Sequence, residues 1–312
     1  MLVELKPEEY KEVFGNNLNP FISYPFIEHN AGKAEKLCFL ADTHEKSSIG
    51  LIGGIRDKVL LSPFSAPFGG FHYKHETIHY SKIFEFVTDL KLYAQKSGIE
   101  RIEIILPPDI YCQTFNAKVI NALLRAGYKM LIPDITSIGY LTTFTGHFSN
   151  HKSVKNYKKA LKNGLVFFEA TTMEEKKAAY DLVVHNRLWL NRPMSMTFTE
   201  VIEILNIWPV DFFIVSDKQN NNVASAIFYR SHPTITQAVW WGDNELGRSL
   251  RAMDYLCDKL WNHYKNMGYK YIDIGISSEE GVPNEGLLWF KEMLDAFTFL
   301  RCHFVFETFS NK

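Results

Sequence analysis

The sequence predicts a mixed α/β (α+β) protein built from two tandem copies of one α/β unit. Three observations support this: a repeated order of segments, a constant spacing between matching positions, and enough apolar residues for two cores. The chain has 312 residues, of which 46% are hydrophobic, and this length is typical of two domains. We expect the first domain at 1–145 and the second at 146–312.

The first copy begins with three segments whose apolar character is typical of strands, at 37–41, 49–55 and 58–64. An amphipathic helix pattern follows and ends at Gly98, the kind of residue that commonly follows a helix C-terminus. A strand at 99–106 and a second helix at 116–126 complete the unit.

The second copy repeats this order. Three predicted strands lie at 211–216, 223–229 and 235–241. A helix predicted at 249–267 ends before Gly268, and a strand at 269–276 and a helix from about 285 to 295 follow.

Matching positions in the two copies are 170 residues apart. Gly98 corresponds to Gly268, and residues 102–104 (IEI) correspond to 272–274 (IDI). A constant offset favours duplication over chance similarity. We expect each copy to form a three-strand meander, after which a crossover helix brings in a parallel strand.

Composition argues against several classes of protein. The formal net charge is -1, whereas nucleic-acid-binding proteins usually carry a basic excess. The four cysteines are far apart in the sequence, which is typical of reduced, structural thiols. The N-terminal residues are acidic where a signal peptide would be basic and then apolar, and no run of 18 apolar residues occurs. We therefore expect a cytoplasmic protein with no membrane span.

A basic segment lies between the copies at 151–165. Val154, Tyr157 and Leu161 share one face of a predicted helix, and four lysines share another: Lys155, Lys158, Lys159 and Lys162. The segment is either a solvated amphipathic helix or a basic arm that meets a phosphate-bearing substrate.

Four stretches carry a resemblance to a known family: VKNYKKALKNGL (154–165), VASAIFY (223–229), VWWGDN (239–244) and YIDIGISSEEGVPNEGLLWFKE (271–292). With the duplicated layout, they make the chain similar to the GNAT-type acyltransferase superfamily, and most of all to the FemAB-like (Fem peptidyltransferase-related) tandem-GNAT proteins. The resemblance covers the chain from about 150 onward, and 1–145 by layout only. It implies two GNAT-like domains, the first degenerate and walling the acceptor site with its turn at 62–70, the second holding the donor and catalytic site.

The resemblance implies acyl-CoA, such as acetyl-CoA, as a co-substrate and no metal. In the superfamily, glycines at a helix start let backbone N–H groups converge on the pyrophosphate. Here, counting from Arg248, the glycine positions hold Arg251 and Met253, so the expected loop is degraded. We predict that the donor site involves Trp241, Gly242, Gly247, Arg248, Arg251 and Asn284, although Asn284 is also a good helix N-cap.

Three residues are candidates for the chemistry. Lys291 occupies the Phe-Lys string of the last helix, where the resemblance implies a charge that either stabilises an oxyanion or anchors a phosphate of the donor or acceptor. We expect it at the edge of the buried stripe of that helix. Asp243 and Glu285 are the carboxylates nearest the expected site, and either could accept the proton of an attacking amine. Of Trp240 and Trp241, we expect one in the core and one at the site.

A competing motif is present at 75–79 (HETIH), which matches the zinc-hydrolase pattern H-E-x-x-H. It lies at a predicted helix start instead of mid-helix, and the third-ligand candidates are weak: His72, Glu85 and Asp89. Three exposed histidines at a helix entry, His72, His75 and His79, are the favoured interpretation.

The function predicted from the resemblance is N-acyl or aminoacyl transfer to a small amine acceptor, such as a phosphate-bearing sugar or cell-envelope precursor. Three alternatives remain: a tRNA-dependent aminoacyl transferase, which the near-neutral charge disfavours, a zinc-dependent hydrolase, and a non-catalytic binding protein with a degenerate acyl-CoA site. The sequence leaves the oligomeric state open.

Overall fold

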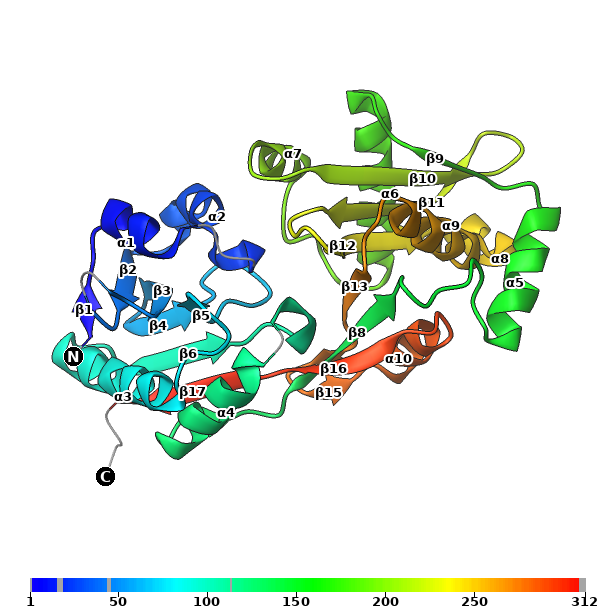
Figure 1. The fold of residues 1–312 in the computed structure, drawn as a ribbon. Helices are drawn as coiled ribbons and strands as arrows, with labels where there is room; N and C mark the ends of the chain where they lie inside the picture. Colours follow the sequence, from blue (N-terminus) through cyan, green and yellow to red (C-terminus); the bar gives the residue numbers. More distant parts are fainter. Residues whose placement is uncertain (1, 16–18, 44–45, 113, 309–312) are drawn as a thin grey trace. The chain divides into compact units, whose positions relative to one another are not determined.

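The computed structural model describes residues 2–15, 19–43, 46–112 and 114–308, and the chain forms two compact units (Figure 1). Unit 1 comprises Met1–Ile135, Ser278–Val282 and Phe299–Lys312; unit 2 comprises Thr136–Ser277 and Pro283–Thr298. Each unit contains one mixed sheet with helices packed against it, as predicted. A small hairpin, β14 (Ser278–Glu279) and β15 (Val282–Pro283), forms a separate two-stranded sheet.

The sheet of unit 1 has the strand order β1-β2-β3-β4-β6-β17-β7, and β5 pairs with β3. Its strands are β1 (Val3–Glu4), β2 (Lys36–Ala41), β3 (Ile49–Arg56), β4 (Val59–Ser62), β5 (Phe71–Tyr73), β6 (Arg101–Ile105), β7 (Lys129–Met130) and β17 (His303–Glu307). The helices are α1 (Pro7–Phe14), α2 (Tyr24–His29), α3 (Tyr80–Lys96) and α4 (Phe115–Arg125). Strands β2, β3 and β4 form an antiparallel meander, and β6 then pairs parallel to β4. The predicted meander and crossover are confirmed.

The sheet of unit 2 has the order β16-β8-β13-β12-β11-β10-β9. Its strands are β8 (Asp134–Tyr140), β9 (Val166–Glu169), β10 (Val210–Ser216), β11 (Asn222–Tyr229), β12 (Ile235–Asp243), β13 (Tyr271–Ile276) and β16 (Phe297–Arg301). The helices are α5 (His151–Lys162), α6 (Met173–Trp189), α7 (Phe198–Glu203), α8 (Glu245–Leu250), α9 (Ala252–Asn266) and α10 (Glu285–Glu292). The β10-β11-β12 meander is antiparallel, and β13 pairs parallel to β12.

The two sheets share one strand order, but each takes the strand next to one edge from the other half of the chain. Strand β17, from the C-terminal end of the chain, pairs with β6 and β7 in unit 1. Strand β8, from the first half, pairs with β13 in unit 2. The fully buried Phe304 of β17 belongs to the core of unit 1. The compact units are therefore discontinuous in sequence, and the division at 145/146 stays a prediction about the duplicated segments.

Helix ends follow the predicted glycines, with one difference. Gly98 and Gly268 each come just after a helix and have a positive φ, +69° and +87°, in the left-handed region. A Cβ added at either position would meet no atom within 4 Å. The helix predicted at 249–267 was too long by one turn. It breaks at Arg251, whose φ of 65° ends α8 and precedes α9, because Asn244 caps a separate short helix.

No helix among the described residues is long and apolar enough to cross a bilayer. The four cysteines are free; Cys38, Cys257 and Cys302 are buried, and Cys112 is half-buried.

Candidate functional site

The candidate site of unit 2 lies where β12 and β13 separate. The two strands pair over three positions, from Ile235 with Tyr271 to Gln237 with Asp273. Strand β12 then continues along β11 to Asp243, with an extra residue, Val239, between the paired positions Ala238 and Trp240. A bulge of this kind re-aims the backbone and side chains that follow it.

Lys291 lies beside the end of β13. All residues of helix α10 are described, and among them Lys291 is the buried one, at 1% exposure. Its ammonium group donates hydrogen bonds to the carbonyl oxygens of Gly275 and Ile276, both at 2.8 Å. Burial lowers the pKa of Lys291 to about 7, and the nearby Asp273 carboxylate acts in the opposite direction. The expectation that Lys291 lies at the edge of the buried stripe was wrong, because these two carbonyls satisfy its ammonium inside the fold.

Asp273 is a part of the site that the sequence analysis used only to mark the repeat. Its side chain is 1% exposed, in the interior of the sheet. One carboxylate oxygen accepts a hydrogen bond from the backbone N–H of Gly275 at 2.9 Å, and the other accepts one from the Gln237 amide at 3.3 Å. Gly275 has a φ of +73°, and this bend turns the following carbonyls toward Lys291. The sequence did contain a signal for this residue, because an acidic side chain within an otherwise apolar strand indicates a carboxylate that is buried and needs hydrogen-bond partners.

Asp243 ends β12 and is also buried, at 8% exposure. Burial raises the pKa of Asp243 to about 6, while the charge of Arg248 acts in the opposite direction. The Arg248 Nε atom lies 4.0 Å from the carboxylate. The arginine stacks on Trp189, with its guanidinium carbon 3.7 Å from the ring centroid. Its buried Nη2 atom has no hydrogen-bond partner among the described residues. A carboxylate with a raised pKa is suited to accept a proton near neutral pH.

Helix α6 packs against the end of β12, and α10 contacts the same segment through Trp241. Trp241 contacts Phe290 of α10, with ring centroids 6.1 Å apart, whereas Trp240 is buried beside Tyr229. Gly242 is pressed against Asn186, whose side-chain atoms would lie 2.4 Å from an added Cβ. Asn186 also donates a hydrogen bond to the Asp243 carbonyl at 2.6 Å. The adjacent tryptophans point to different surroundings, as the strand period predicts.

The residues at the start of α8 and α9 do not form a phosphate cradle. The Gly247 N–H already donates to the Asn244 side chain at 2.8 Å. Gly247 is needed for packing, since a Cβ there would lie 2.1 Å from the Val223 carbonyl oxygen. At α9, the exposed Arg251 holds the N-cap position, and the buried Asp254 places a carboxylate in the first turn. A carboxylate already occupies the end of the helix that would attract a pyrophosphate, so this stretch does not fit coenzyme A.

Two further predicted residues lie at the start of α10. The Asn284 side chain accepts a hydrogen bond from the Leu287 N–H at 3.0 Å, so it is the N-cap. Glu285 is the first residue of the helix and is exposed. The structure thus accounts for Asn284 by capping, and it buries Asp243 but not Glu285.

The basic segment forms α5, which packs through a different face from the one expected. Its buried residues are Ser153, Asn156 and Ala160, whereas Leu161 is 49% exposed. Polar bonds explain the difference: Ser153 donates to the Met293 carbonyl at 2.6 Å, and Asn156 donates to Asp254 at 3.0 Å. All the lysines of α5 are exposed.

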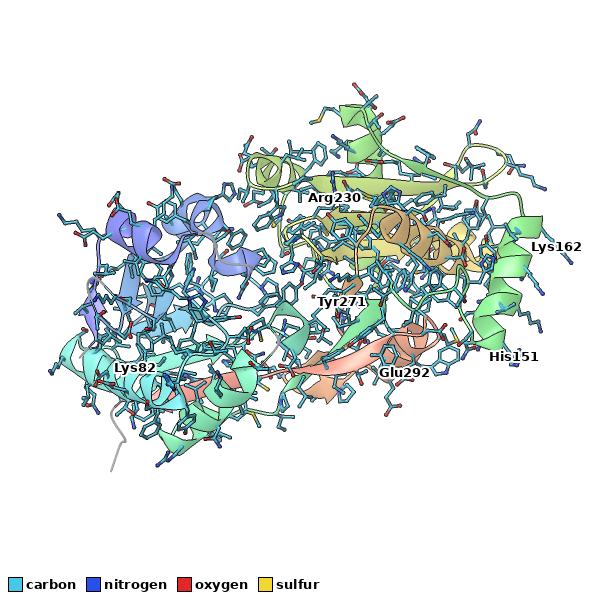
Figure 2. All side chains as sticks on the ribbon, viewed as in Figure 1. Lys82, His151, Lys162, Arg230, Tyr271 and Glu292 are labelled. Atoms are coloured by element: carbon cyan, nitrogen blue, oxygen red, sulfur yellow. The ribbon has the colours of Figure 1, made fainter. Side chains whose placement is uncertain are left out.

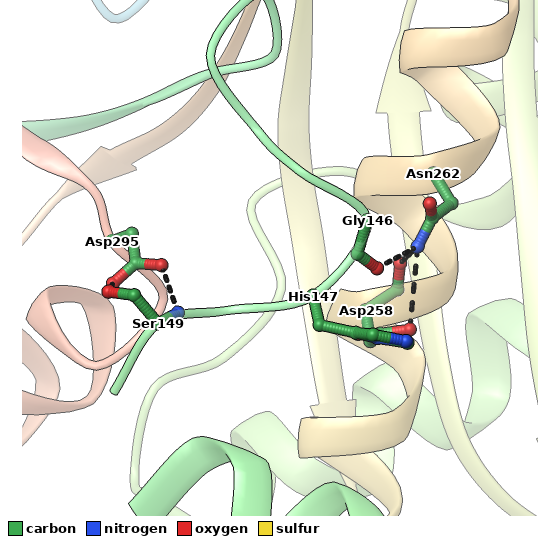
Figure 3. Close-up of polar contacts among 6 residues, drawn as sticks. All are labelled: Gly146, His147, Ser149, Asp258, Asn262 and Asp295. Carbon is green, nitrogen blue, oxygen red and sulfur yellow. Dashed lines mark hydrogen bonds and ion pairs between the residues drawn. The ribbon is translucent and has the colours of Figure 1, made fainter. Parts of the chain in front are cut away.

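The loop between β8 and α5 is fastened by polar contacts that the sequence did not indicate (Figure 3). His147 Nδ1 lies 2.8 Å from the buried Asp258 carboxylate. Asn262 donates to the Gly146 carbonyl at 2.9 Å. The Ser149 N–H and hydroxyl both donate to Asp295. These contacts hold α5 in a defined position within unit 2.

The H-E-x-x-H motif is not helical. His75 and His79 are exposed, as expected, and His79 is the residue before α3. Glu76 accepts hydrogen bonds from the backbone N–H groups of Thr114 and Phe115, both at 2.8 Å, and so caps the start of α4. The expectation of three exposed histidines was wrong for His72, the third-ligand candidate, which is buried and bonded to Tyr10. Burial lowers the pKa of His72 to about 3. No cluster of three metal-ligating side chains occurs among the described residues.

Comparison with known proteins gives matches at the level of structure. No protein-family model matches the sequence, and no curated protein matches it. Among solved structures, FemX matches with a TM-score of 0.68 at 10% identity, over 98% of this chain and 97% of that one. L-PGS from Bacillus licheniformis matches with a TM-score of 0.60 at 14% identity, over 98% and 91%. A tandem GNAT protein from the clavulanic acid biosynthesis pathway matches with a TM-score of 0.56 at 8% identity, over 100% and 99%. This chain therefore has the tandem GNAT fold, of the FemAB-like type.

Proposed function

We propose that unit 2 catalyses transfer of an acyl group from an activated ester or thioester to an amine. The amine nitrogen forms a bond to the acyl carbonyl carbon and loses a proton. The tetrahedral intermediate then collapses, its bond to oxygen or sulfur breaks, and the leaving group takes up a proton. A group that favours the negative charge on the carbonyl oxygen, and a base for the amine proton, are the two requirements of this reaction.

The burial of Lys291 is the observation that carries this proposal. A lysine 1% exposed in a folded protein is rare, since its charge is costly to remove from water. Here it lies at the point where β12 and β13 separate, bonded to two strand carbonyls. Two of its three N–H groups make these bonds. We assign the third to the oxyanion, and because Lys291 is 1% exposed, the substrate must displace the side chains that cover the ammonium. Removing one such donor typically costs about 3 kcal/mol of transition-state stabilisation.

Asp243 is our candidate for the base. Its buried carboxylate, with a pKa raised to about 6 by burial, is ionised at pH 7 and retains affinity for a proton. Glu285 is exposed at the surface of α10, which makes it the weaker candidate. FemX and the tandem GNAT protein share their fold with this chain. The shared fold supports acyl transfer as the class of reaction, and it does not identify the substrates.

The donor and acceptor are defined here by chemistry alone. The stretch around Gly247 and Arg251 does not fit the pyrophosphate of coenzyme A, so no step of the proposal depends on it. The acceptor is a small amine, for which a phosphate-bearing sugar or a cell-envelope precursor remains our expectation. An aminoacyl ester carried on tRNA is the second donor to be tested.

The test uses the purified full chain with acetyl-CoA or charged tRNA and a panel of amines, with mass spectrometry to detect the amide. The informative variant is Lys291→Gln, which keeps hydrogen-bond donors but removes the charge. Lys270→Gln, at an exposed position, is the matched control. We expect the first variant to lose at least about 100-fold in turnover and the control to lose none. Equal activity in both variants, or absence of transfer with every donor, would contradict the proposal.

A further inference from the structure

Helix α5 lies in the middle of a long stretch without acidic residues. No Asp or Glu occurs between Asp134 and Glu169, although the chain contains 35 acidic residues in 312. Five lysines lie within α5: Lys152, Lys155, Lys158, Lys159 and Lys162. The overall charge of -1 therefore conceals a strongly basic local surface.

The five lysines occupy one side of the helix. At 100° per residue, they and His151 fall within about a third of the helix circumference, opposite the buried Ser153, Asn156 and Ala160. From Lys152 to Lys162 the row is roughly 15 Å long. Figure 2 shows His151 and Lys162 at the two ends of α5, with their side chains directed away from the sheet of unit 2. We call this set the lysine face.

The carboxylates beside the lysine face leave most of its charge unneutralised, although Asp254 attracts Lys152. Asp254 and Asp258 of α9 are buried beneath α5, and they are bonded to Asn156 and His147 respectively. Asp295 accepts its bonds from Ser149, before the helix starts. The outward ammonium groups therefore present their charge to solvent.

Exposed apolar side chains border the lysine face. Trp289 of α10 is 48% exposed, and the Lys152 ammonium lies 4.0 Å from its ring centroid. Leu161, on α5 itself, is 49% exposed, and Val166 of the edge strand β9 is 55% exposed. Lysine next to exposed tryptophan and aliphatic side chains is the composition of surfaces that lie at a lipid–water boundary.

We propose that the lysine face docks unit 2 onto an anionic lipid surface. Each lysine near such a surface contributes an attraction that falls off within about one Debye length, and the apolar border allows shallow insertion. A nucleic acid is the competing partner for a basic row. The composition favours lipid, because α5 contains lysine and no arginine, whereas arginine is preferred for nucleic-acid recognition. This docking is independent of the proposed acyl transfer.

The test is vesicle flotation of the purified full chain. Vesicles with 30–40% phosphatidylglycerol in phosphatidylcholine are compared with pure phosphatidylcholine, at about 0.05 and about 0.5 M salt. The variant is Lys155→Glu with Lys159→Glu. The matched control makes the same charge change at the exposed Lys82 and Lys96 of α3, a helix that also carries Glu85 and Asp89. Circular dichroism confirms that both variants are folded.

We expect binding to the anionic vesicles only, weakened by salt. The α5 double variant should lose on the order of 1000-fold in partition coefficient, because each reversal removes an attraction and adds a repulsion of similar size, and the α3 control should lose much less. Equal flotation with neutral vesicles, or equal loss in both variants, would overturn the proposal. Binding to tRNA in filter assays that requires Lys155 and Lys159, without flotation, would replace lipid by nucleic acid as the partner.

Discussion

Lys291 donates a hydrogen bond to the carbonyl oxygen of Ile276 at 2.8 Å, so a buried ammonium caps the end of strand β13. A second bond to Gly275, also at 2.8 Å, completes the contact. The Lys291 side chain thus has two roles. It stabilises the bend after Asp273, and it places a titratable charge where strands β12 and β13 separate. The predictions below separate these two roles.

The pH dependence of turnover should be bell-shaped and narrow. Protonation of Asp243, whose pKa burial raises to about 6, removes the base on the acidic side. Deprotonation of Lys291, whose pKa burial lowers to about 7, removes the charge on the alkaline side. We expect Lys291→Gln to abolish the alkaline limb and Asp243→Asn the acidic limb. A flat profile between pH 6 and 8 would contradict both assignments.

The stability of the protein should also report the burial of Lys291. Because its folded-state pKa of about 7 lies below the ordinary value of 10.5, the unfolded chain binds the extra proton between these values. The free energy of unfolding should therefore rise with pH in this window, by up to about 1.4 kcal/mol per pH unit. Urea titrations of wild type and Lys291→Met should diverge above pH 7 and run parallel below it. Parallel curves throughout would mean that the lysine is exposed in solution.

Gly247→Ala should destabilise the protein by about 1–3 kcal/mol. An added Cβ would lie 2.1 Å from the Val223 carbonyl oxygen, which is backbone and cannot move aside. Gly286 of α10 is the control, since its nearest neighbour to an added Cβ is 3.7 Å away; alanine there should be neutral or slightly stabilising. Thermal melts of both variants measure the difference. Equal effects would show that α8 does not pack on β11 as described.

Phe304→Ala should destabilise unit 1, although the residue is close to the C-terminus. The side chain is fully buried in the core of unit 1, and its removal should cost about 3–5 kcal/mol. Phe297, on β16, is 56% exposed and serves as the control. Hydrogen exchange should show lost protection in β6, the partner of β17. Loss confined to unit 2 would contradict the strand exchange.

Glu76→Ala should lower stability by about 1–2 kcal/mol without changing metal content. The carboxylate caps α4 through the N–H groups of Thr114 and Phe115. Elemental analysis of the wild type should find no stoichiometric zinc. One zinc per chain, lost on His79→Ala, would restore the hydrolase interpretation.

Local sequence was sufficient to predict the elements and their order. Strands such as β10 and β11 are short apolar runs, and Gly98 and Gly268 mark helix ends through their positive φ. Because period and turn chemistry act over a few residues, they can be read along the chain, and the constant offset of 170 then indicated two copies. The family resemblance added the fold type and singled out Lys291.

The tertiary structure alone decided which segments meet. Nothing local distinguishes a strand that stays in its own half from β8 or β17, which complete the sheet of the other half, because pairing partners are chosen by long-range packing. The same holds for chemistry. Asp243, Glu285 and Lys291 look equivalent as charged residues in sequence, but the fold buries Asp243 and Lys291 and leaves Glu285 exposed. Desolvation is a property of the whole packed unit, and it is desolvation that brings the pKa values of Asp243 and Lys291 close to neutral.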